Sequence, residues 1–268
     1  MAECDNDQKN ANRFTGFGDI YDRARPSVPD YPIKIILQYL QKKPCIVVDL
    51  GCGTGLSSIP WKNKCDKFIG IDPSEDMLAF AKPKESSAVK FQCGFGNDTG
   101  LPDLCADAVV CSQSFHWMEP KSTLKEINRI LSPCGVFAAI DCDWPPISVW
   151  QAEKAYSDIY EYIKRLERET PEIRKSFVRY DKNNHLKNMS DSGYFRYCRE
   201  ITFSNTEKCT ASRFTELLLS QGSTQKLIKN YPEKINEKLN AFQEKIGKIF
   251  GDNEFDIDFS YRMRIAVK

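Results

Sequence analysis

Apolar residues in the first half of the chain occur in short continuous runs, and amphipathic segments separate these runs. Five of the runs predict strands: CIVVDL (45–50), KFIGID (67–72), VKFQCG (89–94), ADAVVCSQ (106–113) and GVFAAIDC (135–142). Helical spacing occurs between them, for example in SEDMLAFAK and in KSTLKEINRIL (121–131). Strands with apolar residues on both faces, alternating with helices, predict a parallel sheet that helices cover on both sides.

The pattern changes after Trp144. Residues 148–190 are rich in charge and mostly helical in period, and include the long stretch VWQAEKAYSDIYEYIKRLERE. Two later segments, YFRYCREITF (194–203) and FDIDFSYRMRIAVK (255–268), alternate apolar and polar residues as strands do. We expect them to pair antiparallel at the sheet edge. The predicted fold class is α/β, with a seven-stranded, mostly parallel sheet, an antiparallel edge strand and a helical insertion.

The chain shows no internal repeat and no low-complexity linker, so its 268 residues predict one domain. We expect a flexible N-terminal tail at 1–16 and a single domain at 17–268. Within that domain the expected parts are a core at 17–145, a helical insertion at 146–192, and strands and helices at 193–268. The insertion is expected to be either a lid over a site or a helix with a solvated charged face.

Composition limits the classes of partner. The formal net charge is +1, which gives no reason to expect a nucleic-acid partner. No apolar run reaches the roughly 20 residues of a membrane span, and the polar N-terminus lacks a signal-peptide core. Eleven cysteines without a C-x-x-C spacing, together with only two histidines, favour reduced thiols over disulfides or a metal site. We therefore expect a cytoplasmic protein with no membrane partner and no metal.

The stretch IVVDLGCGTGLSS (46–58) places three alternate glycines directly after a predicted buried strand. Glycines at the carboxyl end of such a strand allow a ligand to lie against the main chain. Dinucleotide sites prefer G-x-G-x-x-G, whereas this motif is G-x-G-x-G preceded by Asp49. A carboxylate there suits an ammonium group better than a pyrophosphate. Asp72, at the end of the next strand, can accept hydrogen bonds from two ribose hydroxyls or can serve only as a helix cap.

Four segments carry a family resemblance: VVDLGCGTG, IGIDPSEDML, CGFGNDTGLPDLCADAVVCSQSFHWM and LKEINRILSPCGVF. In order, they resemble the successive motifs of class I S-adenosylmethionine-dependent methyltransferases over residues 17–145. The chain looks most like the small-molecule branch, which includes trans-aconitate methyltransferase-like and ubiquinone-biosynthesis-like enzymes. The resemblance implies a Rossmann-like fold and S-adenosyl-L-methionine as cofactor.

The resemblance also implies a set of cofactor-binding residues. They are Tyr21, Arg25, Asp49, Gly51, Gly53, Asp72, Pro73, Met77, Phe95, Gly96, Asn97, Ser112 and Gln113. Arg25 is expected to pair with the cofactor carboxylate, and Ser112 and Gln113 are expected to face the sulfonium. Many relatives have an acidic residue at the position of Asn97. Packing against the sheet is an equal alternative for Met77.

Residues after the fourth and fifth strands are candidates for acceptor contacts. His116 is expected to line the site, with a general-base role as the lesser alternative. Trp117, Asp141 and Trp144 are expected to line the acceptor site, with one of Asp141 and Asp143 facing the pocket and the other exposed. His185 lies in the polar run KNNHLKN and is expected on the solvated surface.

The leading hypothesis is transfer of a methyl group from S-adenosylmethionine to a small-molecule acceptor by in-line displacement. A non-catalytic S-adenosylmethionine-binding protein and an NAD(P)-dependent oxidoreductase are the alternatives. Methylation of RNA or protein is disfavoured by the balanced charge and because C-S-Q-S (111–114) replaces an N-P-P-Y-like motif. The pattern does not specify the acceptor, the methylated atom or the oligomeric state.

Overall fold

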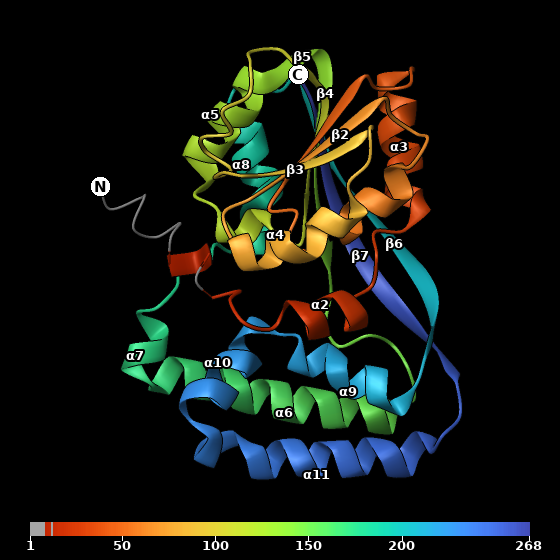
Figure 1. The fold of residues 1–268 in the computed structure, drawn as a ribbon, viewed down its shortest axis with the longest axis vertical. Coiled ribbons are helices and arrows are strands. Elements are labelled where there is room, and N and C mark those ends of the chain that lie inside the picture. The colour runs from red at the N-terminus through yellow and green to blue at the C-terminus, as the bar shows by residue number, and fades with distance from the viewer. Residues whose placement is uncertain (1–8, 12) are drawn as a thin grey trace.

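The seven predicted strands form a single sheet (Figure 1). The computed structural model describes residues 9–11 and 13–268. The strands are β1 (Ile46–Leu50), β2 (Lys67–Asp72), β3 (Val89–Cys93), β4 (Ala106–Ser112), β5 (Leu131–Cys142), β6 (Tyr197–Cys209) and β7 (Phe255–Val267). Their order across the sheet is β3-β2-β1-β4-β5-β7-β6. The order reverses between β1 and β4, and open α/β sheets bind ligands at such a point.

Strand direction confirms the predicted mixed sheet and refines it. β3, β2, β1, β4 and β5 pair in parallel, and β7 pairs antiparallel with both β5 and β6. The reversed strand is therefore β7, one position inside the edge, and the edge strand β6 runs parallel to β5. β5 begins at Leu131, earlier than predicted, because the SPCG turn forms a bulge in which Cys134 has a φ of 64°.

Helices connect the strands and cover the sheet. The α-helices are α2 (Gly18–Ala24), α3 (Asp30–Leu40), α4 (Glu75–Ala81), α5 (Pro120–Ile130), α6 (Trp150–Glu169), α7 (Pro171–Arg174), α8 (His185–Asp191), α9 (Ala211–Leu219), α10 (Gly222–Asn230) and α11 (Pro232–Phe250). Short 3₁₀ helices are η1 (Leu56–Trp61), η2 (Lys82–Lys84), η3 (Phe115–Trp117) and η4 (Lys182–Asn184). No described helix has both the length and the apolar character needed to cross a membrane.

Both faces of the sheet are buried, as the continuous apolar runs predict. Val47 and Val48 are neighbours on β1 and are both fully buried, yet they belong to different apolar clusters. The cluster around Val47 includes Ile33 of α3, and the cluster around Val48 includes Leu124 of α5. Adjacent residues of a strand point to opposite faces, so an uninterrupted apolar sequence follows from burial on both sides.

A separate layer of helices lies beyond the carboxyl ends of the parallel strands (Figure 1). It consists of α6, from the predicted insertion, and of α9, α10 and α11, which the chain forms between β6 and β7. Tyr156, Phe214 and Phe242 meet at its centre, with Tyr156 and Phe214 fully buried. The layer thus combines two regions that are distant in sequence, whereas α8 packs against the sheet beside α5.

The described part of the predicted N-terminal tail is packed, which corrects the expectation of a flexible segment at 1–16. Asn10, Ala11 and Arg13 are all buried. The side-chain amide of Asn10 donates to the carbonyls of Trp117 and Val178, and its oxygen accepts from the Val178 N–H at 2.9 Å. Residues 1–8 and 12 lie outside the described residues.

Candidate functional site

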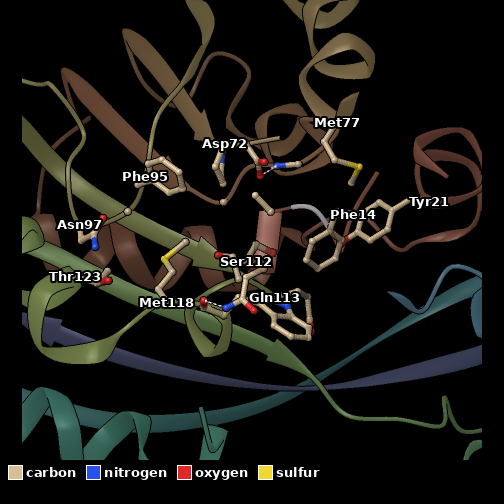
Figure 2. Close-up of a pocket in the computed structure, with 18 residues that line it drawn as sticks. Phe14, Tyr21, Asp72, Met77, Phe95, Asn97, Ser112, Gln113, Met118 and Thr123 are labelled. Carbon is tan, nitrogen blue, oxygen red and sulfur yellow. Dashed lines mark hydrogen bonds between the residues drawn. The ribbon is translucent and has the colours of Figure 1, made fainter. Parts of the chain in front are cut away.

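A cavity opens at the carboxyl ends of β1, β2 and β4, where the strand order reverses (Figure 2). We call it the cofactor cavity, and it is lined by Asn10, Ala11, Phe14, Tyr21, Gly51, Gly53, Asp72, Pro73, Met77, Phe95, Gly96, Asn97, Ser112, Gln113, Ser114, Trp117, Met118 and Thr123. No lysine or arginine is among these lining residues. The cavity wall is therefore built from main chain, apolar side chains and neutral polar groups, with Asp72 as its carboxylate.

The turn after β1 forms one wall of this cavity and depends on glycine. Gly51 has a φ of 73°, and a Cβ at this position would lie 2.5 Å from the Ser114 Cβ. Ser114 is itself held in place, because its hydroxyl donates to the Leu50 carbonyl at 2.5 Å. The Gly51 N–H donates to the Ile71 carbonyl at 2.7 Å, which joins the turn to β2. Both the backbone conformation and the close packing therefore require a residue without a side chain.

Asp72 lies at the end of β2 with both carboxylate oxygens engaged by main chain. Its Oδ2 accepts from the Gly53 N–H at 2.8 Å (Figure 2), and its Oδ1 accepts from the Ser74 N–H at 2.9 Å. Ser74 is the N-cap of α4, and its hydroxyl accepts from the Met77 N–H. Burial raises the pKa of Asp72 to about 6, although these hydrogen bonds oppose the shift.

Asp49 is fully buried on β1, beneath the glycine turn. Its Oδ2 accepts from the Ser57 hydroxyl, whereas its Oδ1 has no hydrogen-bond partner among the described residues. Burial raises the pKa of this carboxyl to about 7. A buried carboxylate oxygen without a donor is costly, and a cationic group placed at the turn would lower that cost.

A second cavity of about 420 Å³ adjoins the first and has a different character. We call it the basic cavity, because its lining includes seven cationic side chains: Arg13, Arg25, Lys164, Arg179, Lys182, Arg262 and Arg264. It shares Phe14, Tyr21, Gln113 and Trp117 with the cofactor cavity. The wall of the basic cavity comes from the N-terminal segment, the strand ends, α6, the 179–183 loop and the start of α10.

Tyr21 and Gln113 mark the point where the cavities meet. Both residues line the cofactor cavity, the basic cavity and a third, smaller cavity that also includes Arg25, Ser57 and Trp144. Gln113 has a φ of 59°, a left-handed conformation that costs energy for a residue with a side chain. The Lys182 ammonium donates to the Gln113 Oε1 at 3.4 Å. A strained residue at the junction of the cavities is typical of a functional site.

Comparison with known proteins agrees with this geometry. The family described as "Methyltransferase domain" matches residues 48–139, which extend from β1 through most of β5. The chain carries a class I methyltransferase domain. A Bacillus subtilis protein named as a methyltransferase, YqeM, is 34% identical over 131 residues, which are 46% of this chain and 53% of that protein. The chain thus spans about half the length of this relative and of the mycobacterial methyltransferases that it also matches.

A longer match extends the likeness to most of the chain. An uncharacterized methyltransferase-like protein of Schizosaccharomyces pombe is 28% identical over 243 residues, covering 85% of this chain and 83% of that protein. The structure of a type II methyltransferase from Anaeromyxobacter dehalogenans aligns with a TM-score of 0.65 at 18% identity, covering 91% and 97% of the two chains. The expected class of methyltransferase is confirmed, and the branch within the class stays a prediction.

Eleven of the thirteen expected cofactor residues line the cofactor cavity of this methyltransferase domain, and Arg25 and Asp49 do not. Asp49 lies below the turn. Arg25 lines the two adjoining cavities, where its guanidinium donates to the Ser220 hydroxyl at 2.8 Å and to the Ser220 carbonyl at 3.2 Å. It also lies over the rings of Trp144 and Tyr21. The pairing of Arg25 with a cofactor carboxylate stays a prediction.

The structure adds lining residues that the motifs did not indicate. Asn10, Ala11 and Phe14 come from the N-terminal segment, and Met118 lies on the far side of the cavity (Figure 2). Phe14 packs edge-on against Trp117, with ring centroids 5.5 Å apart. The available signal was the pair of aromatic residues, Phe14 and Phe17, within an otherwise polar segment.

Asp141 is the centre of a buried charged network. One of its oxygens lies 2.9 Å from the Lys182 ammonium and 3.5 Å from His116 Nδ1. The other accepts from Arg264 at 3.1 Å and lies 3.6 Å from His185 Nε2. The neighbouring cations and imidazoles hold the Asp141 pKa well below its usual range despite burial. Asp141 therefore lies behind the basic cavity, and the partly exposed Asp143 lines it, which reverses one expected assignment.

The two histidines of this network are neutral. Burial, with the positive charge of Lys182 adding to it, lowers the pKa of His116 to about 3. Burial likewise lowers the pKa of His185 to about 4. His185 is fully buried, which corrects its expected place on the solvated surface. Atoms of His116, Asp141 and His185 lie within 4.8 Å of one another, but Lys182 and Arg264 already occupy the carboxylate, which disfavours a metal ion there.

Proposed function

We propose that this protein transfers a methyl group from S-adenosylmethionine to a small-molecule acceptor by in-line displacement. The observation that carries the proposal is the junction at Tyr21 and Gln113, which joins the cofactor cavity to the basic cavity. A methyl donor in the first cavity and an acceptor in the second would meet at this junction. The volume of the basic cavity, about 420 Å³, falls within the usual range of sites for small molecules.

The residues of the cofactor cavity fit an adenosine that carries an amino-acid tail. The carboxylate of Asp49, buried below the glycine turn, would favour an ammonium group placed at that turn, and the remaining acceptor capacity of Asp72 would receive ribose hydroxyls. Pro73, Met77 and Phe95 offer apolar contacts to a purine. The lining contains no cationic side chain for a pyrophosphate. The G-x-G-x-G spacing and the carboxylate of Asp49 favour S-adenosylmethionine over a nicotinamide dinucleotide.

The bound cofactor supplies a methyl group that its positive sulfur already activates. The protein must then align the acceptor and exclude water, and alignment of this kind supplies about 7–11 kcal/mol of barrier reduction. Tyr21 and Gln113 are placed to do so, and Trp117 and Trp144 close the basic cavity nearby. His116 has a pKa of about 3, so it acts as a neutral hydrogen-bonding group rather than as a general base.

Two measurements test the proposal against its alternatives. S-Adenosylhomocysteine should raise the unfolding temperature of the protein, and NADH should not. Labelled methyl groups should then pass from S-adenosylmethionine to a component of a metabolite extract. Stabilisation by NADH alone would favour the oxidoreductase, and binding without transfer would favour a non-catalytic protein. A cytoplasmic location and the absence of a nucleic-acid partner stay predictions, which the balanced charge supports.

A further inference from the structure

The cations of the basic cavity are unevenly balanced by carboxylates. Arg262 pairs with Asp143 at 3.0 Å, and Lys182 and Arg264 pair with Asp141. Arg264 also lies 2.7 Å from Glu200. These pairs neutralise the side of the cavity formed by β5 and β7. Of the four other cations, Arg25 donates to Ser220, and Arg13, Lys164 and Arg179 lie on the side near the helical layer. Asp181 is a further carboxylate of the lining.

Two of these three cations share one carboxylate, and the third has no ion pair within the described residues. Arg13 donates to Glu167 Oε1 at 2.5 Å, and Lys164 lies 3.1 Å from Glu167 Oε2. Arg179 forms no ion pair within the described residues, and its guanidinium lies over the Trp117 ring, 4.8 Å from the centroid. We call Arg13, Lys164 and Arg179 the cationic cluster. It carries more positive charge than Glu167 neutralises.

The cluster is also short of hydrogen-bond acceptors. The Arg13 side chain is almost completely buried, and its Nε and Nη1 have no hydrogen-bond partner in the described part of the chain. Burial and the charge of Arg179 lower the pKa of Lys164 to about 8, despite Glu167. Arg13 and Lys164 are thus largely buried cations without enough acceptors, which is costly, and an anion bound beside them and the exposed Arg179 would lower that cost.

The position of the cluster separates it from the cofactor. Arg13, Lys164 and Arg179 line the basic cavity and neither of the other two cavities. Arg13 and Arg179 lie over the ring of Trp117, which lines both the basic cavity and the cofactor cavity. A molecule filling the basic cavity would therefore contact both the cluster and the junction at Tyr21 and Gln113.

We propose that the acceptor carries an oxyanion, such as a carboxylate, which the Arg13–Lys164–Arg179 cluster binds while another atom of the acceptor meets the methyl group at Tyr21 and Gln113. This inference rests on the proposed function. Arg179 determines specificity, because a guanidinium stacked on Trp117 keeps its N–H edge free for an oxyanion. Lys164 adds a second charge from α6. The volume of the basic cavity, about 420 Å³, suits a small acid rather than a polyanion such as a nucleic acid.

The test separates acceptors by charge. A metabolite extract is divided on an anion-exchange resin, and each fraction is incubated with the protein and methyl-labelled S-adenosylmethionine. We expect at least tenfold more labelled product from the retained fraction than from the flow-through. The double variant Arg179→Gln/Lys164→Gln should lower this labelling at least tenfold, and its affinity for S-adenosylhomocysteine should stay within twofold. Arg174→Gln, an exposed position outside the cavity, is the matched control and should change neither.

The outcomes separate this proposal from the one it rests on. Label that arises mainly from the flow-through, or labelling that the double variant leaves unchanged, would overturn the anionic acceptor and leave methyl transfer intact. Binding of S-adenosylhomocysteine without label from either fraction would reject methyl transfer, and the anionic acceptor with it. A second double variant, Arg179→Gln/Lys164→Arg, keeps the charge at position 164. More labelling by this variant than by Arg179→Gln/Lys164→Gln would support recognition by charge.

Discussion

The main-chain N–H of Gly53 donates to Asp72 Oδ2 at 2.8 Å, which ties the turn after β1 to the end of β2. Ser74 occupies the other oxygen of the same carboxylate. Each carboxylate oxygen can accept more than one hydrogen bond, so Asp72 keeps acceptor capacity toward the cavity that it lines. One side chain thereby holds the turn in shape and faces the cavity.

Asp72→Asn should weaken binding of S-adenosylhomocysteine at least tenfold. The amide keeps the size of the side chain but loses the charge, and charge-assisted hydrogen bonds contribute about 1.5–3 kcal/mol each. Titration calorimetry measures the affinity, and a cooperative thermal transition shows that the variant is folded. Asp252→Asn, in the exposed turn after α11, is the control. Unchanged affinity in a folded Asp72→Asn protein would reject the ribose contact.

The affinity for S-adenosylhomocysteine should increase with pH between 6 and 8. Burial raises the pKa of Asp49 to about 7, so the unliganded carboxyl is mostly protonated at pH 6 and mostly ionised at pH 8. The ligand ammonium needs the ionised form. Affinity should therefore rise about tenfold over this range, with release of a proton. Calorimetry in buffers of different ionisation enthalpy measures both the affinity and the number of protons released. In Asp49→Asn only the smaller, about twofold dependence from Asp72, whose pKa is about 6, should remain, and a tenfold dependence that persists would assign it to another group.

The contributions of Asp49 and Asp72 to the stability of the unliganded protein should show the opposite trend, although the buried His116 and His185 contribute in the other sense below pH 6.5. Asp49 and Asp72 have folded pKa values of about 7 and about 6, above their unfolded values near 3.8. Each therefore contributes stability that is present below about pH 4 and is lost as pH rises through the folded pKa. Urea unfolding at pH 5 and pH 8 should show a smaller decrease in stability for Asp49→Asn than for the natural sequence. An equal decrease in stability for the variant and the natural sequence would show that Asp49 does not cause the pH dependence.

The sheet and the glycine turn after β1 could be predicted, because the sequence patterns that indicate them are local. The run IVVDL is buried on both faces, and the motif after it forms the tight turn at Gly51. The burial of His185 could not be predicted in this way. Its neighbours Asn183 and Asn184 are exposed, so the segment reads as polar, while the one inward side chain meets Asp141 from a distant strand.

The N-terminal segment and the basic cavity were missed for the same physical reason. Asn10 is buried because it completes hydrogen bonds of Trp117 and Val178, more than 100 residues away in the chain. The cationic cluster combines the N-terminal segment, α6 and the loop after α7. In sequence each of its members is an ordinary charged residue in a polar segment, and only the fold brings them together around Glu167.

Gly51→Ala should destabilise the fold far more than Gly100→Ala. Both glycines have similar positive φ values, 73° and 67°, so both substitutions carry a backbone cost of about 1–2 kcal/mol. A Cβ at Gly51 also meets the Ser114 Cβ at 2.5 Å, whereas a Cβ at Gly100 has nothing within 4 Å. Overpacking adds about 1–3 kcal/mol. Urea unfolding of the two variants isolates this steric term, and equal losses would contradict the packing at Ser114.

Arg13→Met should destabilise the protein by about 3 kcal/mol, because it leaves Glu167 buried without its closest partner. Lys164 still contacts Glu167, which limits the loss. The double variant Arg13→Met/Glu167→Gln should cost less than the two single changes together. Lys154→Met breaks an exposed pair with Asp158 on the same helix and should cost less than about 0.5 kcal/mol. Urea unfolding measures the free energy of unfolding of Arg13→Met, Glu167→Gln, the double variant and Lys154→Met.

Arg13→Met should also weaken binding of S-adenosylhomocysteine, although Arg13 does not line the cofactor cavity. Its side chain lies over the Phe177 ring, 4.1 Å from the centroid, and its pairing with Glu167 fixes the N-terminal segment to α6. Ala11 and Phe14 of that segment form part of the cofactor cavity wall. Loosening the segment should increase the dissociation rate severalfold, as measured by stopped-flow displacement. A rate that stays unchanged in the folded variant would show that the segment holds its place without this ion pair.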